Sequence, residues 1–340
     1  MNHRDLEEFL MYPYKINAKL NQNESPFPPP EIILKKVCES LRVINRYQTR
    51  MLFDKVLDLY SEYSGVNKSH LWLGPGIDIL FEKIFHRYSG EKFLVVMPTY
   101  FYFVEQAKHF KIRFVETSLD RDFRVDLDKV FEFMNDVSII YFDNPNNPTG
   151  NIIIKRKQIE EILESFRGIL LIDEAYFEFC GETVIDLVES YENLVVLRTM
   201  SKAFSMAGMR ITIYALGEGL RNLIHEETEM FRVSTPALIA AKEALENIDY
   251  VKKLVAFVKS EREKMIDNLK KLGYKGFPSY TNFVLIDTGI RNVYQKLFER
   301  EILVKDVSSL LGEGFIRVTI GSKSENDLFL NAMKEFKCLN

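Results

Sequence analysis

The chain has 340 residues, a hydrophobic fraction of 46%, a charged fraction of 28% and a formal net charge of −4. These values describe a folded globular protein and exclude intrinsic disorder, and the length favours a large domain with a smaller one. Lysine and arginine are scattered along the chain, so the basic patch that nucleic-acid binding requires is missing and we predict no nucleic-acid partner.

The amino-terminal sequence and the cysteines indicate the compartment. The stretch MNHRDLEEFL is charged and unlike a signal peptide, and no run approaches the 18 apolar residues of a membrane-spanning helix. Cys38, Cys180 and Cys338 are far apart, which fits a reducing compartment. Neither the cysteines nor the histidines show a metal-ligand spacing. We therefore predict a cytoplasmic protein with no membrane association and no metal site.

Residues 1–30 are expected to form an extended arm. A polar turn at residues 21–24 is followed by prolines at 26 and 28–30, and proline fixes φ and disfavours helix in the residue before it. Such a segment has few internal partners, so we expect it to pack on another part of the protein. A helix, a loop around Tyr47 and a second helix ending near Gly65 are predicted to follow.

A glycine turn, Gly74-Pro75-Gly76, precedes an apolar stripe from Ile77 to Tyr88 with helical spacing. A glycine-rich helix start presents free backbone N–H groups and the positive end of the helix dipole, which favour an anion. Taken alone, the turn is better explained as the plain start of a helix. A phosphate site nearby would favour the anion.

Short apolar strands are predicted at 93–97, 112–116, 137–142, 169–172 and 194–197. Helical patterns such as the one after residue 155 separate some of them. This alternation is typical of a mostly parallel sheet with helices on both faces.

Polar clusters follow three of these strands, at residues 143–150 (DNPNNPTG), at 173–176 (DEAY) and around Lys202. Ligands of parallel sheets bind at the carboxyl ends of the strands, so we expect the clusters to converge on one crevice. Each cluster alone has a simpler explanation, since Asn-Pro often marks a turn and an acid often caps a helix. Their joint order has no such explanation.

Residues 197–210, LRTMSKAFSMAGMR, place Lys202 on a loop between two apolar runs. A desolvated lysine has a lowered pKa and, once neutral, condenses with a carbonyl to form a Schiff base. The hydroxyls of Thr199 and Ser201 and the guanidinium of Arg210 suit a phosphate. The stretch suggests an aldehyde cofactor that carries a phosphate, although a solvated loop with an ordinary lysine explains it equally well.

A second, smaller domain is predicted after the large one. The pattern from Leu220 to Leu272 is helical, and helices also follow the later strands. The predicted strands of this domain are 282–287, 302–305 and 315–320. The expected division is an arm at 1–30, a large domain at 31–245 and a small domain at 246–340.

Over nearly its full length, the chain resembles the fold-type I pyridoxal-phosphate aminotransferases, and within them the histidinol-phosphate aminotransferase group. The resemblance rests on motifs in the order that the family has them: NESP after a PY dipeptide, GPGID, PTY, NPNNPTG, DEAYFEF, RTMSKAFSMAGMR and IRVTIG. Each motif alone is weak, and together they are specific. The implied fold is α/β, with a mostly parallel seven-stranded sheet between helices in the large domain and a smaller α/β carboxyl-terminal domain.

The resemblance implies a role around pyridoxal 5'-phosphate for each matching residue. Lys202 would form the Schiff base, and Asp173 would pair with the protonated pyridine nitrogen. Asn147 and Tyr176 would bind the ring hydroxyl, and Tyr100 would stack on the ring.

The same resemblance implies how the cofactor phosphate is held. Ser201 and Arg210, with Thr199 as a further hydroxyl, would contact it through their side chains. Ile77 and Asp78 would contact it through their backbone N–H groups.

Further residues would complete the site. Tyr47 matches a tyrosine that the neighbouring subunit contributes, which implies a homodimer with shared active sites. Arg317 would bind the anionic end of the substrate, and Asn23 and Tyr14 on the arm would close over it. Lys305 stands about where the histidinol-phosphate enzymes tend to carry an arginine, and it lacks the bidentate fork of that residue.

The implied activity is ping-pong transamination between histidinol phosphate and 2-oxoglutarate, with the lysine moving a proton as general base and acid. An aminotransferase for aromatic amino acids and a threonine-phosphate decarboxylase are alternatives that stay open, since Lys305 leaves the substrate less defined. A cofactor-binding regulator without catalysis is disfavoured, because such regulators usually carry a DNA-binding extension for which 340 residues leave no room.

Overall fold

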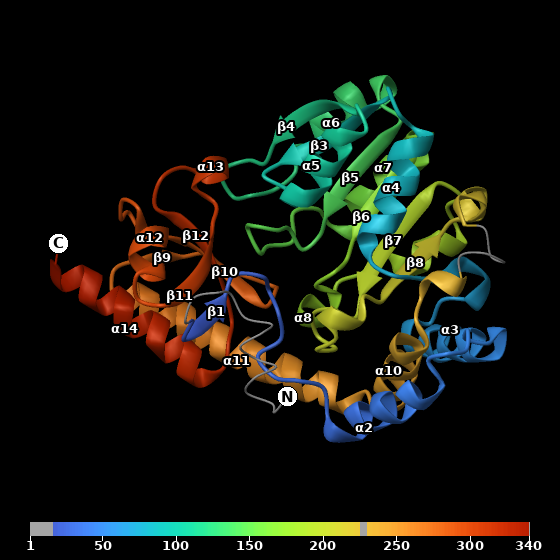
Figure 1. Ribbon diagram of the computed structural model, residues 1–340. Helices are drawn as coiled ribbons and strands as arrows, with labels where there is room; N and C mark the ends of the chain where they lie inside the picture. Colours follow the sequence, from blue (N-terminus) through green and yellow to red (C-terminus); the bar gives the residue numbers. More distant parts are fainter. Residues whose placement is uncertain (1–15, 225–229, 340) are drawn as a thin grey trace. The chain divides into compact units, whose positions relative to one another are not determined.

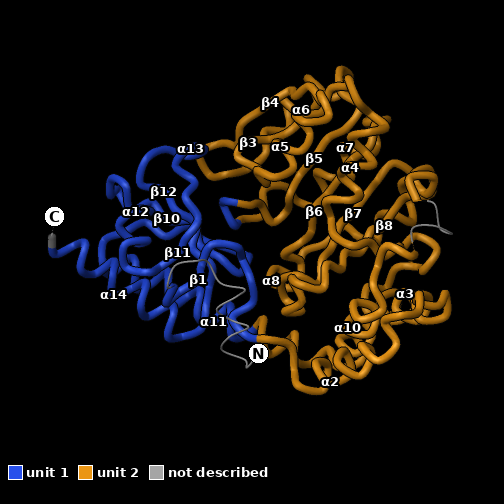
Figure 2. The backbone as a smooth tube through the Cα atoms, viewed as in Figure 1, with its two compact units in different colours: residues 1–27, 148–150, 256–340 blue, residues 28–147, 151–255 orange. Residues whose placement is uncertain are grey.

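The computed structural model describes residues 16–224 and 230–339 (Figure 1). These residues form two compact units (Figure 2). The large unit contains residues 28–147 and 151–255. The small unit contains the described residues within 1–27, 148–150 and 256–340.

The large unit is built on a seven-stranded sheet. In spatial order its strands are β2 (Leu71–Gly74), β8 (Thr212–Leu216), β7 (Leu194–Thr199), β6 (Ile169–Asp173), β5 (Ile139–Asp143), β3 (Lys92–Met97) and β4 (Arg113–Ser118). Strand β8 is antiparallel to both of its neighbours, and every other pairing in this sheet is parallel. The predicted α/β fold with a mostly parallel seven-stranded sheet is confirmed.

The central strands are readable in the sequence because both of their faces are covered. Every residue of β5, β6, β7 and β8 is buried, which produces continuous apolar runs. Strand β2 was not predicted. Its four residues are too few to show a period, and only the pairing with β8 reveals it.

The large unit also contains helices (Figure 1). They are α2 (Glu31–Ser40), α3 (Arg50–Ser64), α4 (Ile77–Arg87), α5 (Phe101–His109), α6 (Leu127–Phe133), α7 (Arg156–Ser165), α8 (Phe177–Cys180) and α10 (Thr235–Glu246). Short 3-10 helices are η1 (Leu41–Val43), η2 (Lys68–His70), η3 (Met134–Asp136), η4 (Ile185–Glu189), η5 (Ala207–Met209), η6 (Glu218–Leu223) and η7 (Met230–Arg232). The glycine turn at 74–76 opens α4 as predicted, with Gly76 as its cap.

The helical pattern predicted from 220 to 272 corresponds to several separate helices among the described residues. The short helices η6 and η7 come first, and α10 and α11 (Asp249–Lys271) are separate helices. Ser234 starts α10 by accepting a hydrogen bond from the N–H of Ala237 at 3.3 Å. The predicted amphipathic stripe from 251 corresponds to α11. The expected domain boundary at 245/246 falls at the end of α10, and the two compact units divide inside α11.

The small unit has a five-stranded sheet. In spatial order its strands are β1 (Ala18–Leu20), β11 (Ile302–Asp306), β12 (Phe315–Thr319), β10 (Phe283–Asp287) and β9 (Lys275–Gly276). Its further helices are α12 (Val293–Phe298), α13 (Ser308–Leu311) and α14 (Lys323–Leu339). Strand β1 belongs to the expected arm and pairs parallel with β11, whereas the other pairings are antiparallel. Residues 18–20 of the expected arm are therefore part of this sheet.

Candidate active site

Three polar loops meet at one edge of the seven-stranded sheet. Strands β5, β6 and β7 are adjacent and parallel, with Asp143 opposite Asp173 in the register. Their carboxyl ends lead into residues 144–147, residues 174–176 and the turn that contains Lys202. The pairing of the strands thus brings together the three clusters on which the sequence prediction depends.

Asp173 is the last residue of β6 and is only 5% exposed. Its Oδ1 accepts a hydrogen bond from the N–H of Ala175 at 3.0 Å, and its Oδ2 accepts one from the hydroxyl of Tyr141 at 3.4 Å. Burial raises the pKa of Asp173 to about 7, and these two donors and the positive charge of Lys202 act in the opposite direction. A buried carboxyl in this setting favours a positively charged partner.

Two tyrosines and an amide belong to the same edge of the sheet. Tyr176 and Asn147 are buried, and Tyr100 is half-buried just before α5. Burial raises the pKa of Tyr100 well above its usual value, and the nearby carboxyl groups of Asp78 and Asp173 act in the same direction. The hydroxyl of Tyr100 therefore lies near both the start of α4 and the end of β6.

The glycine turn places a guanidinium against the start of α4. Gly76 has φ 125°, which favours glycine, and a Cβ there would lie 2.7 Å from Nη2 of Arg210. The hydroxyl of Tyr214 donates to the carbonyl of Gly76 at 2.6 Å and holds the turn. Ile77 and Asp78 begin the helix, so their N–H groups have no acceptor within it. Backbone donors and a cation thus lie close together.

The side chains expected around a phosphate already have partners of their own. Nη2 of Arg210 lies 2.8 Å from Oδ2 of Asp78 in a partly exposed ion pair. Thr199 donates through its hydroxyl to Oγ of Ser201 at 2.9 Å, and its Oγ1 lies 3.2 Å from the carbonyl of Ile211. An anion bound here would compete with the Asp78 carboxylate for the guanidinium.

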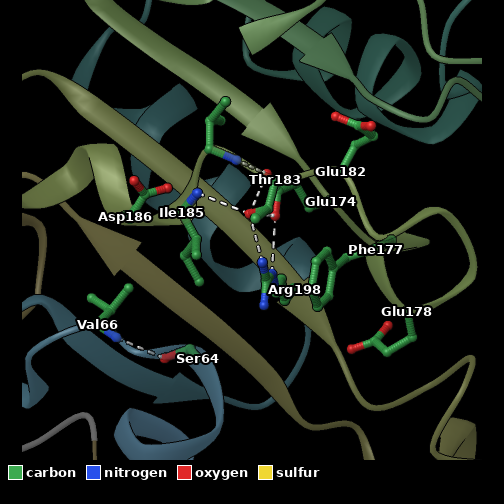
Figure 3. A network of polar contacts seen from close by, with 12 residues as sticks. Ser64, Val66, Glu174, Phe177, Glu178, Glu182, Thr183, Ile185, Asp186 and Arg198 are labelled. Atoms are coloured by element: carbon green, nitrogen blue, oxygen red, sulfur yellow. Dashed lines mark hydrogen bonds and ion pairs between the residues drawn. The ribbon is translucent and has the colours of Figure 1, made fainter. Parts of the chain in front are cut away.

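Sequence reasoning did not predict the buried ion pair behind this edge (Figure 3). Nε of Arg198 lies 3.0 Å from Oε2 of Glu174, and both side chains are 2% exposed. The guanidinium also donates to the hydroxyl of Thr183 at 2.6 Å and lies 3.5 Å from the ring centroid of Phe177. An arginine inside the apolar run LVVLRT is the signal that could have indicated a buried partner.

Two buried tyrosines that support the site also escaped prediction. Tyr141 contacts the carboxyl of Asp173, and Tyr214 holds the carbonyl of Gly76. Within an apolar strand a tyrosine is not distinguishable from other core residues, so only the fold assigns these contacts.

The small unit carries two of the predicted substrate residues on neighbouring strands. Lys305 of β11 and Arg317 of β12 are directly opposite each other. Opposed residues of antiparallel strands point to the same face, so two cations share one side of this sheet. Arg317 is buried and donates through Nη2 to the carbonyl of Asn21 at 2.6 Å, whereas Lys305 is exposed.

Asn23 is fixed within the small unit, and it has a left-handed backbone conformation with φ 54°. Its N–H donates to Oγ1 of Thr319 at 2.9 Å, and its carbonyl accepts from Nδ2 of Asn282 at 2.9 Å. Tyr14 lies outside the described residues.

Tyr47 lies in the loop between η1 and α3 of the large unit. It is 83% exposed, and its ring meets that of Phe231 edge to face at 5.6 Å between centroids. Within the described ranges, no group of three His, Cys, Asp or Glu side chains suits a metal ion, and no helix combines the length and apolar character needed to cross a bilayer.

Comparisons with known proteins agree over almost the whole chain. The family model for aminotransferase class I and II matches residues 15–333. A histidinol-phosphate aminotransferase from Sulfurisphaera tokodaii is 33% identical over 347 residues, which cover 96% of this chain and 95% of the relative. One from Thermococcus gammatolerans is 34% identical over 330 residues, which cover 95% and 94%.

A solved structure shares the fold. It is the histidinol-phosphate aminotransferase from Sinorhizobium meliloti in complex with pyridoxal-5'-phosphate, with a TM-score of 0.87 and 23% identity, covering 100% of this chain and 95% of that one. With this fold, the full-length relatives and the family match, the chain belongs to the class I and II aminotransferases and, within them, to the histidinol-phosphate aminotransferase group.

Proposed function

We propose that this protein is a pyridoxal-phosphate-dependent aminotransferase that exchanges an amino group between histidinol phosphate and 2-oxoglutarate, in histidine biosynthesis. The observation that carries the proposal is the sheet edge at which Asp173, Tyr176, Asn147 and the Lys202 turn follow adjacent parallel strands. The relatives that match this chain over nearly its full length are named histidinol-phosphate aminotransferases.

The residues at this edge suit the cofactor chemically. Asp173 is a buried carboxyl that favours a cationic partner, and a protonated pyridine nitrogen is one. Asn147 and Tyr176 supply groups for the ring hydroxyl, and Tyr100 supplies an aromatic face. When bound, pyridoxal phosphate supplies a ring that accepts electrons as a bond to the substrate Cα breaks.

The phosphate of the cofactor would lie at the start of α4. The backbone N–H groups of Ile77 and Asp78, the hydroxyls of Ser201 and Thr199, and the guanidinium of Arg210 are the donors that we assign to it. A helix start with a neighbouring arginine favours a dianion through the helix dipole and through charge-assisted hydrogen bonds.

The side chains divide the work of the reaction. Lys202 would hold the cofactor through its aldehyde, and the amine of Lys202 would move the proton of the substrate Cα as general base and acid. Asp173 would pair with the ring nitrogen and favour its protonated form. The two half-reactions use the same groups in opposite directions, which gives ping-pong kinetics.

Substrate recognition is assigned to Arg317 and Lys305, with Asn23 and Tyr14 of the arm. Two cations on one face of the small sheet suit a substrate with a phosphate or carboxylate group. Like charges placed directly opposite destabilise a sheet, so a bound anion would relieve their repulsion.

We further propose a homodimer in which Tyr47 reaches the neighbouring active site. The stretch around Tyr47 exposes a series of large apolar side chains, namely Ile32, Leu41, Val43, Ile44, Tyr47 and Met51. Exposed apolar patches of this kind mark interaction surfaces. Lys202→Ala and Tyr47→Ala test the sharing of sites. Each variant alone should be inactive, and a mixture should recover activity, since one hybrid site has both residues intact. A mixture as inactive as its components would contradict the exchange.

A substrate panel tests the amino donor. The absorbance of the aldehyde form of the bound cofactor should disappear on addition of histidinol phosphate and return with 2-oxoglutarate. Phenylalanine and O-phosphothreonine test the two alternatives, an aromatic amino acid aminotransferase and a threonine-phosphate decarboxylase. No response to histidinol phosphate would refute the proposed donor.

The covalent role of Lys202 has a direct test. Borohydride reduction followed by mass spectrometry should find the cofactor attached to the unmodified protein and absent from Lys202→Ala. A reduced adduct that persists in the variant would refute the assignment. The cytoplasmic location is a prediction from the sequence, and fractionation of cells that produce the protein would test it.

A further inference from the structure

Asp143 is the last residue of β5 and is 3% exposed. Its carboxyl accepts three hydrogen bonds. Oδ1 accepts from the hydroxyl of Thr99 at 2.7 Å and from Nδ2 of Asn146 at 2.8 Å. Oδ2 accepts from the N–H of Asn147 at 2.7 Å. One buried carboxyl therefore holds groups from two separate loops.

Each of these loops carries a residue assigned to the cofactor ring. Thr99 immediately precedes Tyr100 in the loop after β3, and Asn147 belongs to the loop after β5. The two strands are parallel neighbours in the sheet. Asn146 strengthens the link, since its Nδ2 also donates to the carbonyl of Pro98 at 3.0 Å.

We propose that Asp143 is a positioning residue that sets the spacing between Tyr100 and Asn147, and thereby the placement of the cofactor ring between them. It acts through the two loops. This inference rests on the proposed cofactor-binding function.

The three partners require an acceptor at both carboxyl oxygens. Thr99, Asn146 and the backbone of Asn147 all offer donors, which favour the ionised carboxylate and oppose the burial that raises the pKa of Asp143. An amide at position 143 has the same shape but directs its own N–H at one of these donors. That clash would leave a buried donor without an acceptor and would push one loop away.

The test compares three variants. Asp143→Asn replaces an acceptor by a donor, Thr99→Val removes only the hydroxyl on the Tyr100 side, and Asp136→Asn is the matched control. Asp136 is an exposed aspartate shortly before the same strand. The measurements are the dissociation constant for pyridoxal phosphate, the absorbance of the bound cofactor as a function of pH, and the melting temperature of the apoprotein.

We expect Asp143→Asn to weaken cofactor binding about tenfold, the loss expected for a hydrogen bond to a charged group, and Thr99→Val to weaken it less. Both variants should shift the midpoint of the absorbance titration, because the spacing between Tyr100 and Asn147, and with it the position of the ring, then changes. Asp136→Asn should match the unmodified protein in both measurements.

A lower melting temperature with an unchanged dissociation constant and midpoint would mean that Asp143 only stabilises the fold, and would overturn the inference. If Asp143→Asn does not fold, Thr99→Val decides, and unchanged values in that variant are equally decisive. An unmodified protein that does not bind pyridoxal phosphate would overturn the proposed function together with this inference. The identity of the amino donor does not enter the measurement.

Discussion

Two consecutive residues at the end of β6, Asp173 and Glu174, are both buried carboxyl groups with different surroundings. Glu174 accepts from the guanidinium of Arg198, from the hydroxyl of Thr183 and from the N–H of Val184 at 2.7 Å (Figure 3). Asp173 accepts one backbone hydrogen bond and one long contact from a tyrosine. Glu174 has an ion pair with Arg198 within the fold, whereas Asp173 is the carboxyl that we assign to the cofactor ring nitrogen.

The difference separates a structural charge from a functional one. A buried charge with a complete set of partners stabilises its surroundings, and its loss exposes the partner to an unfavourable environment. Among the described residues Asp173 lacks an ion pair of this kind, burial raises its pKa to about 7, and carboxyl groups with raised pKa values are common at functional sites.

The largest expected effect is on catalysis and comes from Asp173→Asn. The amide cannot hold a positive charge on the ring nitrogen, so kcat should fall roughly 100- to 1000-fold. The melting temperature of the apoprotein should stay the same or rise, because a neutral amide is easier to bury than a carboxylate. Steady-state kinetics and thermal denaturation measure the two. A normal kcat in this variant would show that Asp173 does not act in catalysis.

The opposite pattern is expected for Arg198→Met. Removal of the guanidinium leaves Glu174 buried without its counter-charge, which typically costs about 3–5 kcal/mol of unfolding free energy. Denaturant unfolding measures this cost. The double variant Arg198→Met with Glu174→Gln should be more stable than the single variant. Equal stability of the single and the double variant would show that Arg198 and Glu174 do not stabilise each other.

The stability of the apoprotein should depend on pH through Asp173. Its folded pKa of about 7 lies above the usual value for aspartate in an unfolded chain, about 3.9, so the folded state binds more protons between these values. The unfolding free energy therefore falls as pH rises through this window, by a contribution on the order of a few kcal/mol.

Asp173→Asn removes this contribution. The pH experiment therefore measures the difference in unfolding free energy between the variant and the unmodified protein. Asp143 and Glu178 also have pKa values raised by burial, to about 8 and about 7, and they act in both proteins. The advantage of the variant should grow as pH rises from about 4 to 7. A constant difference across that range would contradict the assignment.

The smallest expected effect concerns the partly exposed ion pair at the start of α4. Asp78→Asn keeps the backbone N–H but releases Arg210 from a carboxylate, so pyridoxal phosphate should bind a few-fold more tightly. Exposed pairs of this kind contribute about 0.2–1 kcal/mol. Equilibrium titration with the cofactor measures the change. Weaker binding would indicate that the Asp78 side chain itself contributes to the site.

The chemistry and most of the central strands were accessible from the sequence. Continuous apolar runs predict β5, β6 and β7, and the polar residues that follow these strands predict a site at the strand ends. The order of the motifs points to the family. These signals are local, since each depends on residues within one strand or one turn.

The pairings between distant segments were decided only by the tertiary structure. Asp143 lies opposite Asp173, Lys305 lies opposite Arg317, and Arg198 finds Glu174 across neighbouring strands. No local pattern encodes these contacts, because strand order and register follow from how separate apolar segments pack together. The residue types and their order determine which reaction is possible. The packing of the sheet determines which buried charges have a counter-charge within the protein, as Glu174 has in Arg198.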